Sequence, residues 1–179
     1  MKNDDSKEYS ESDILAIFAR HLDEAKWKYH YTQGQQAIFS GFNGKDALWD
    51  FSMIARAKND GLFHLSVNSY IPNKAGLARQ AAAAEIISRI NWQLALGCFE
   101  MNHADGEIRF RTSLAIAGAD ITPDIIAHLI HSNLYIVDER LSQILAVLYS
   151  HKSPESVLQP KMDKSAIAKV KTQRRFELN

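Results

Sequence analysis

The sequence has one cysteine, no net charge and no long apolar run, and each of these shortages excludes a class of protein. Cys98 is the only cysteine among 179 residues, which excludes an internal disulfide and a cysteine-rich zinc site. The 21 basic and 21 acidic residues cancel, so the whole chain has no field that would attract nucleic acid or an anionic membrane. Nowhere do about 18 apolar residues follow one another, so we expect no membrane-spanning helix.

The start of the chain also lacks the apolar core of a signal peptide. Its sequence, MKNDDSKEYSESD, is charged and rich in hydroxyl groups. A single cysteine fits a reducing compartment, where disulfides are rare. We therefore expect a cytoplasmic protein.

Motifs that carry catalysis are missing as well. The sequence has no glycine-rich phosphate loop, no serine nucleophile elbow and no paired-carboxylate motif. Cys98 would need a neighbouring base to act as a nucleophile, and an inert core cysteine is favoured. His128 and His131 stand three residues apart and could share a metal ion, but no acidic residue accompanies them at a zinc-ligand spacing, so surface or packing histidines are favoured. We expect no catalytic residue, no metal site and no cofactor.

What the sequence does contain is the alternation typical of antiparallel strands. Over residues 108–116 apolar side chains recur at every second position, with Arg109 and Arg111 between them. Asp105 and Gly106 tolerate positive φ, so the run 98–102 can fold back on this strand as a hairpin.

Other runs complete the pattern. Four strands are predicted before the hairpin, a helix lies on either side of these four, and a long helix follows from the Thr122-Pro123 cap. The fold class is therefore α+β: an antiparallel sheet with helices packed on one face, in the order helix, four strands, helix, two strands, helix. The predicted ranges are a helix ending near residue 25, strands 27–31, 37–42, 47–57 and 62–70, a helix over 74–91, strands 98–102 and 107–116, and a helix over 123–149.

Composition divides the chain into three parts. Residues 1–11 have almost nothing to bury and are predicted to be flexible. Residues 12–152 form the predicted domain. Residues 153–179 form a predicted basic tail that is disordered or contains a short helix over 163–175; from Lys152 onward seven basic residues face three acidic ones, a net charge of +4. Such a tail could contact nucleic acid, but the charge is modest and a nucleic-acid partner is not expected.

One group of polar side chains is a candidate binding face. If the strand phases are right, these residues point away from the helices, where they could hold an extended peptide or an anion; an ordinary solvated sheet face explains them equally simply. The group consists of Asp50, Ser52, Arg56, His64, Ser66, Asn68, Arg109 and Arg111.

Three apolar groups are further candidates. Trp27, Tyr29 and Tyr31 could stack a base, but core packing is favoured for them. A pocket between helices and sheet, for a small ligand, would be lined by Trp49, Phe51 and Phe110. A self-association surface on the long helix would consist of Val137, Leu141, Ile144, Leu145 and Leu148.

Within this order of elements, four short motifs resemble the YbjN family, proposed bacterial sensory-transduction regulators. The motifs are Trp27-Lys28-Tyr29, Arg89-Ile90-Asn91, Gly97-Cys98-Phe99-Glu100 and Gly106-Glu107-Ile108-Arg109-Phe110-Arg111, and the resemblance covers about residues 12–150.

The resemblance implies a fold like that of the small dimeric type III secretion chaperones. It further implies a non-enzymatic regulatory or chaperone-like module that forms a homodimer and binds another protein. A small-ligand sensor is the alternative. The family supplies no catalytic residues, and its core does not require the extension after Lys152.

Overall fold

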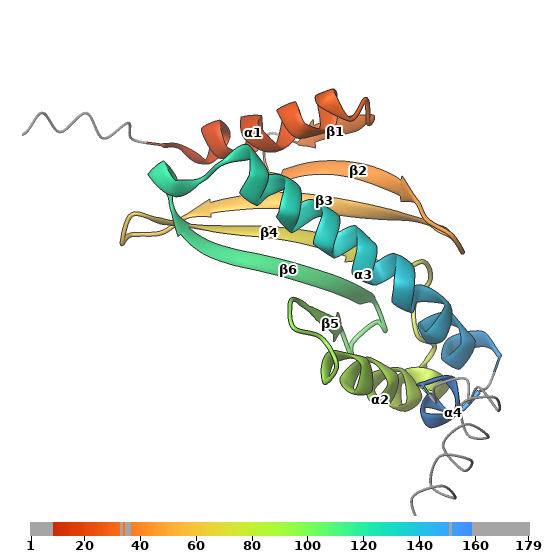
Figure 1. Ribbon diagram of the computed structural model, residues 1–179. Coiled ribbons are helices and arrows are strands. Elements are labelled where there is room, and N and C mark those ends of the chain that lie inside the picture. The colour runs from red at the N-terminus through yellow and green to blue at the C-terminus, as the bar shows by residue number, and fades with distance from the viewer. Residues whose placement is uncertain (1–8, 33, 35–36, 151, 159–179) are drawn as a thin grey trace, which may run out of the picture.

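Six antiparallel strands form one sheet in the order β1-β2-β3-β4-β6-β5, with α1 and α3 against one of its faces (Figure 1). The computed structural model describes residues 9–32, 34, 37–150 and 152–158. Helix α2 contacts β5 and α3. The elements are α1 (Glu11–Glu24), β1 (Tyr29–Thr32), β2 (Ala37–Asn43), β3 (Leu48–Ala57), β4 (Leu62–Tyr70), η2 (Leu77–Arg79), α2 (Gln80–Asn91), β5 (Cys98–Met101), β6 (Ile108–Ala117), η3 (Gly118–Asp120), α3 (Pro123–Tyr149) and α4 (Pro154–Leu158). The predicted class and order are confirmed, and α4 is an addition.

Side-chain caps fix where the first and third helices begin. Ser10 accepts a hydrogen bond from the Asp13 backbone N–H, and the Asp13 carboxylate accepts one from the Ser10 backbone N–H, which is a capping box. Thr122 accepts a hydrogen bond from the Ile125 N–H, and Pro123 occupies the first helical position. The predicted cap and end of the long helix are both confirmed.

Two glycines with positive φ lie in hairpin turns, and the turn at Gly106 is the one predicted from the Asp105-Gly106 pair. Gly61 joins β3 to β4 with φ of 79°, and Gly106 lies between β5 and β6 with φ of 75°. Gly106 also lies against the loop before α2, because its carbonyl accepts a hydrogen bond from the Ala75 N–H at 2.8 Å. A Cβ atom at position 106 would be 2.0 Å from the Ala75 carbonyl oxygen, so no larger residue fits there without movement of backbone.

The second helix differs from its prediction at its beginning. The regular helix starts at Gln80, after the 3₁₀ turn Leu77–Arg79, although the pattern predicted a start at residue 74. Leu77, which lies within the predicted helix range, is 87% exposed. Position 77 lies before the regular turns of α2, so the helical period does not place it toward the core.

The space between helices and sheet is filled by a core rather than a pocket. Trp49, Phe51 and Phe110 are all buried there, with Phe51 and Phe110 inaccessible to solvent. None of the hollows described below is lined by these three side chains. The predicted ligand pocket is therefore wrong, because the aromatic residues that would line it pack against the helices.

The apolar stripe of α3 also packs onto the sheet. Val137, Leu141, Ile144 and Leu148 are buried within the single chain, and Leu145 packs partly buried against the same core. The predicted self-association surface is wrong for the four buried residues, because they are not available to a second copy.

One polar side chain of α3 lies within this core. Asn133 is completely buried, and its amide donates hydrogen bonds to the backbone carbonyls of Val67 in β4, at 2.9 Å, and Phe110 in β6, at 3.3 Å. Its carbonyl accepts a 2.6 Å bond from the Ser69 hydroxyl, which in turn accepts one from the Trp49 indole N–H. Asn133 therefore ties α3 to two central strands.

An asparagine also occupies the outer edge of β5. The Asn91 amide donates to the Phe99 carbonyl at 3.0 Å, and its side-chain oxygen accepts from the Phe99 N–H at 2.8 Å. The side chain thus imitates the pairing of one more strand at that residue and satisfies backbone groups that face away from β6.

The predicted tail begins inside the folded part of the chain. Residues Pro154–Leu158 form α4, which contacts α2 and α3 and buries Pro154. Residues 1–8 of the predicted flexible segment, the predicted basic helix over 163–175, and Gln33 in the first hairpin turn lie outside the described residues. Within the described ranges no helix combines the length and apolar character needed to cross a membrane.

Candidate functional site

All eight predicted binding residues lie on the sheet face opposite α1 and α3. Strand pairing places Ser52 opposite Asn68, Asn68 opposite Arg111, and Arg56 opposite His64. The alternating residues of the same strands, such as Phe51, point into the core. The predicted strand phases are confirmed. We refer to this surface, formed by the outward residues of β2, β3, β4, β6 and β5, as the outer face.

Two of the eight side chains are not available to a partner. Ser52 is fully buried and its hydroxyl lies 3.1 Å from the Tyr70 hydroxyl; Asn68 is 3% exposed and donates to the Ser66 hydroxyl at 3.4 Å. Neighbouring side chains on the same face cover both residues although the described helices lie on the other side. The Ser52 contact joins β3 to β4, whereas the Asn68 hydrogen bond stays within β4.

Four of the predicted residues surround a shallow hollow of about 390 Å³ on the outer face. Arg56, His64, Ser66 and Arg111 lie around it, together with Ser113 and apolar atoms of its neighbours. No carboxylate belongs to this lining. The hollow therefore offers cationic groups and hydroxyls beside apolar surface, a combination that suits an extended acidic segment.

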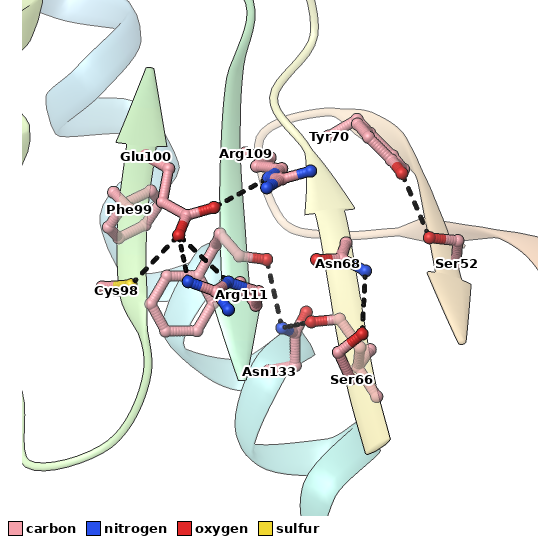
Figure 2. A network of polar contacts seen from close by, with 12 residues as sticks. Ser52, Ser66, Asn68, Tyr70, Cys98, Phe99, Glu100, Arg109, Arg111 and Asn133 are labelled. Atoms are coloured by element: carbon pink, nitrogen blue, oxygen red, sulfur yellow. Dashed lines mark hydrogen bonds and ion pairs between the residues drawn. The ribbon is translucent and has the colours of Figure 1, made fainter. Parts of the chain in front are cut away.

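Glu100 neutralises part of this positive charge at the neighbouring strand (Figure 2). Its carboxylate accepts a hydrogen bond from Arg109 Nε at 2.8 Å and from Arg111 Nε at 3.0 Å. Burial alone would raise the pKa of Glu100, but the hydrogen bonds from the two arginines outweigh it and lower the pKa below its usual value. Glu100 was not among the predicted site residues, although the hairpin register places it opposite Arg109.

Loss of the Glu100 charge is expected to destabilise the fold in a pH-dependent way. Because the pKa of Glu100 is lowered in the folded chain, its ionised carboxylate stabilises the fold fully above about pH 4.3, the pKa of a glutamate in an unfolded chain. This stabilisation is lost as the pH falls through the pKa of Glu100 in the folded chain. Glu100→Gln should cost about 1 kcal/mol of unfolding free energy at pH 7, measured by urea denaturation, and less at pH 3.

A second acidic residue provides the control for this pH effect. Glu85→Gln removes an exposed pair with Arg89 on α2 and should cost less than about 0.5 kcal/mol at either pH. An equal loss for Glu100→Gln at pH 3 and pH 7 would contradict the role assigned to the ionised carboxylate.

Cys98 lies on the outer face rather than in the core, where it was expected. It is half-buried, and its sulfur is 3.8 Å from the Glu100 carboxylate. Burial raises the pKa of the Cys98 thiol, and the negative charge of Glu100 raises it further. The thiol is therefore held protonated, the less nucleophilic form.

The remaining predicted residues lie apart from the hollow. Asp50 is exposed at a second hollow of about 450 Å³ beside β1 and β2, with His30 and Phe39. Trp27 packs against Phe42 and Phe51, so the core interpretation of this aromatic residue is confirmed.

The structure pairs different histidines from those that the sequence suggested. His131 lies beside His21 of α1, whereas His128 faces Ser132 on its own helix. In the part of the chain that the structure describes, no three histidine, cysteine or acidic side chains gather into a metal-binding group. The pairing of His21 with His131 could not have been read from spacing, because the two residues are 110 positions apart.

The sequence matches the model of one protein family, YbjN, over residues 15–144, which run from α1 into α3; the family is described as "Putative bacterial sensory transduction regulator". Among solved structures the chain is similar to YbjN from E. coli, with 15% identity and a TM-score of 0.46 over 74% of this chain and 90% of that one. It is also similar to a chain of the ExsC-ExsE complex, with 9% identity and a TM-score of 0.44 over 73% of this chain and 92% of that one. No curated protein matches the sequence significantly.

Proposed function

Because this chain belongs to the YbjN family, we propose that it is a non-enzymatic regulatory or chaperone-like module that acts by binding another protein. The observation that supports the proposal best is the outer face. It is free of helices in the described part of the chain, and its hollow, lined by His64 and Ser66, lies beside Arg109 and Arg111, which share the single carboxylate of Glu100. These groups provide hydrogen-bond donors and positive charge for a carboxylate-bearing partner.

The partner segment in this proposal is extended and acidic. An extended chain places alternate side chains on one side, which suits a surface whose own residues repeat every second position along the strands. The apolar atoms of Ile54 and Ala115 beside the arginines would accept its apolar side chains. The β5 edge is less suitable for strand addition, because Asn91 already bonds the Phe99 backbone.

The module in this proposal is cytoplasmic and dimeric. With most of the α3 stripe buried, Tyr135 and Tyr149 are the large side chains of that helix that remain exposed for a second copy, at 66% and 52%. Aromatic side chains of this kind are enriched in interfaces between proteins.

Site-specific cross-linking in cells tests the binding face. A photoreactive amino acid would replace Ser113, which is exposed on the outer face, or Ala16, which is exposed on α1. The Ser113 position should capture a defined protein, identified by mass spectrometry, that the Ala16 position does not. The double substitution His64→Glu/Ser113→Glu should reduce binding of that purified protein by at least about tenfold through charge repulsion.

A charge reversal on the helical side controls for a general effect of charge. Arg20→Glu changes an exposed residue of α1 and should leave binding unchanged. Equal capture from Ser113 and Ala16, or equal losses in the outer-face and Arg20 variants, would refute the outer face as the binding surface.

A further inference from the structure

Two histidines from different helices face one another at the surface of the protein. His21 lies in α1 and His131 in α3, helices that run over the same face of the sheet (Figure 1). Their Nε2 atoms are 3.2 Å apart, and the ring planes make an angle of 82°. The contact is a hydrogen bond in which one Nε2 donates and the other accepts, so both ring edges are directed to the same place, and a change of tautomer in the donor ring leaves two lone pairs there.

The separation matches the geometry of a shared metal ion. Two nitrogens that bind one zinc ion at about 2.05 Å, with an angle of about 100–110° between the bonds, stand about 3.1–3.4 Å apart. The observed 3.2 Å lies within this range. The ring centroids are 5.1 Å apart and the rings meet edge to face, which leaves room for an ion beside both Nε2 atoms.

The pair is both held in place and reachable. The Trp27 ring lies 6.3 Å from the His131 ring, centroid to centroid, and limits the orientations of that imidazole. His131 is exposed and His21 is half-buried, so an ion and its waters can approach from solvent.

We propose that His21 and His131 form a two-histidine site for a divalent late transition-metal ion, of the class of zinc, nickel and copper. Imidazole is a preferred ligand of these ions. Because no third metal-binding side chain joins the pair in the described residues, water completes the coordination shell. The bound ion joins α1 to α3 and stabilises the folded chain, since the two ligands come together only when it is folded.

Metal titration of the untagged full-length chain tests the site. With copper(II), nickel(II) or zinc, isothermal calorimetry should find one saturable ion per chain, and the copper complex should show nitrogen couplings in its electron paramagnetic resonance spectrum. His21→Asn and His131→Asn should each lose this binding and the accompanying rise in melting temperature. His128→Asn, on the same face of α3, is the matched control and should retain both.

Chemical protection provides a second measurement that does not depend on the variants folding. Zinc should protect His21 and His131 of the natural chain from modification by diethyl pyrocarbonate, located by mass spectrometry, while His128 remains reactive. Absence of saturable binding for all three ions, binding that persists in both asparagine variants, or equal modification of the pair with and without zinc would each overturn the proposal.

Discussion

Replacing Asn133 with alanine is expected to lower the free energy of unfolding by about 3–4 kcal/mol, because each buried polar group left without a partner costs about 1–3 kcal/mol. The substitution removes the donor to the Val67 and Phe110 carbonyls and the acceptor for the Ser69 hydroxyl, all within the core. A small cavity adds to the cost. Urea denaturation followed by circular dichroism measures the loss.

Two further variants separate the hydrogen bonds from a general effect on α3. Ser132→Ala changes the neighbouring residue, whose hydroxyl lies 3.4 Å from Nε2 of the exposed His128, and should cost less than about 0.5 kcal/mol. Asn133→Asp keeps the acceptor but turns a carboxylate oxygen toward two carbonyls, so it should be at least as destabilising as alanine at pH 7. A loss below about 1 kcal/mol for Asn133→Ala would show that water replaces the amide.

Replacing Gly106 with alanine is expected to cost about 3–5 kcal/mol, the sum of left-handed strain and a steric clash. The added Cβ would meet the Ala75 carbonyl oxygen at 2.0 Å, so the β5–β6 turn and the loop before α2 have to separate. That separation also breaks the hydrogen bond from the Ala75 N–H to the Gly106 carbonyl. Thermal and urea denaturation both report the change.

Gly61 is a matched control, because it has nearly the same backbone conformation without the contact. Its φ is 79°, against 75° for Gly106, and no atom lies within 4 Å of a Cβ built there. Gly61→Ala should therefore show the strain alone, about 1–2 kcal/mol. Equal losses at the two glycines would mean that the contact with Ala75 contributes nothing to stability.

The strand phases could be predicted because they depend on neighbouring residues. Alternation along β6 and the turn at Asp105-Gly106 are local patterns, and once they were recognised the outward positions of Arg109 and Arg111 followed. The burial of Ser52 did not follow, because it depends on Tyr70 from the next strand, which covers it from the side. Periodicity predicts which face of the sheet a residue lies on, but it does not predict how much of that residue is covered by side chains from other strands.

The apolar stripe of α3 illustrates a different limit. Its spacing correctly predicted one buried side of a long helix, but a stripe such as Val137 and Leu141 is equally suited to the chain's own sheet and to a second copy. The same ambiguity made Phe51 and Phe110 look like the lining of a pocket. Contacts between distant segments, such as His21 with His131 or Asn133 with the β4 and β6 backbones, leave no local pattern at all.

The two hydrogen bonds between the Asn91 side chain and the Phe99 backbone limit how copies of this chain can pair through the edges of their sheets. A fibril grows when every molecule offers two strand edges, one to the copy before it and one to the copy after it. Here the side chain of Asn91 occupies the backbone groups of β5 that a strand of another molecule would bond. The other terminal strand of the described sheet is β1. Pairing of two β1 edges uses the edge of both copies, so growth stops at two. The Asn91 amide, together with α2 beside β5, thus favours a closed pair over an open polymer.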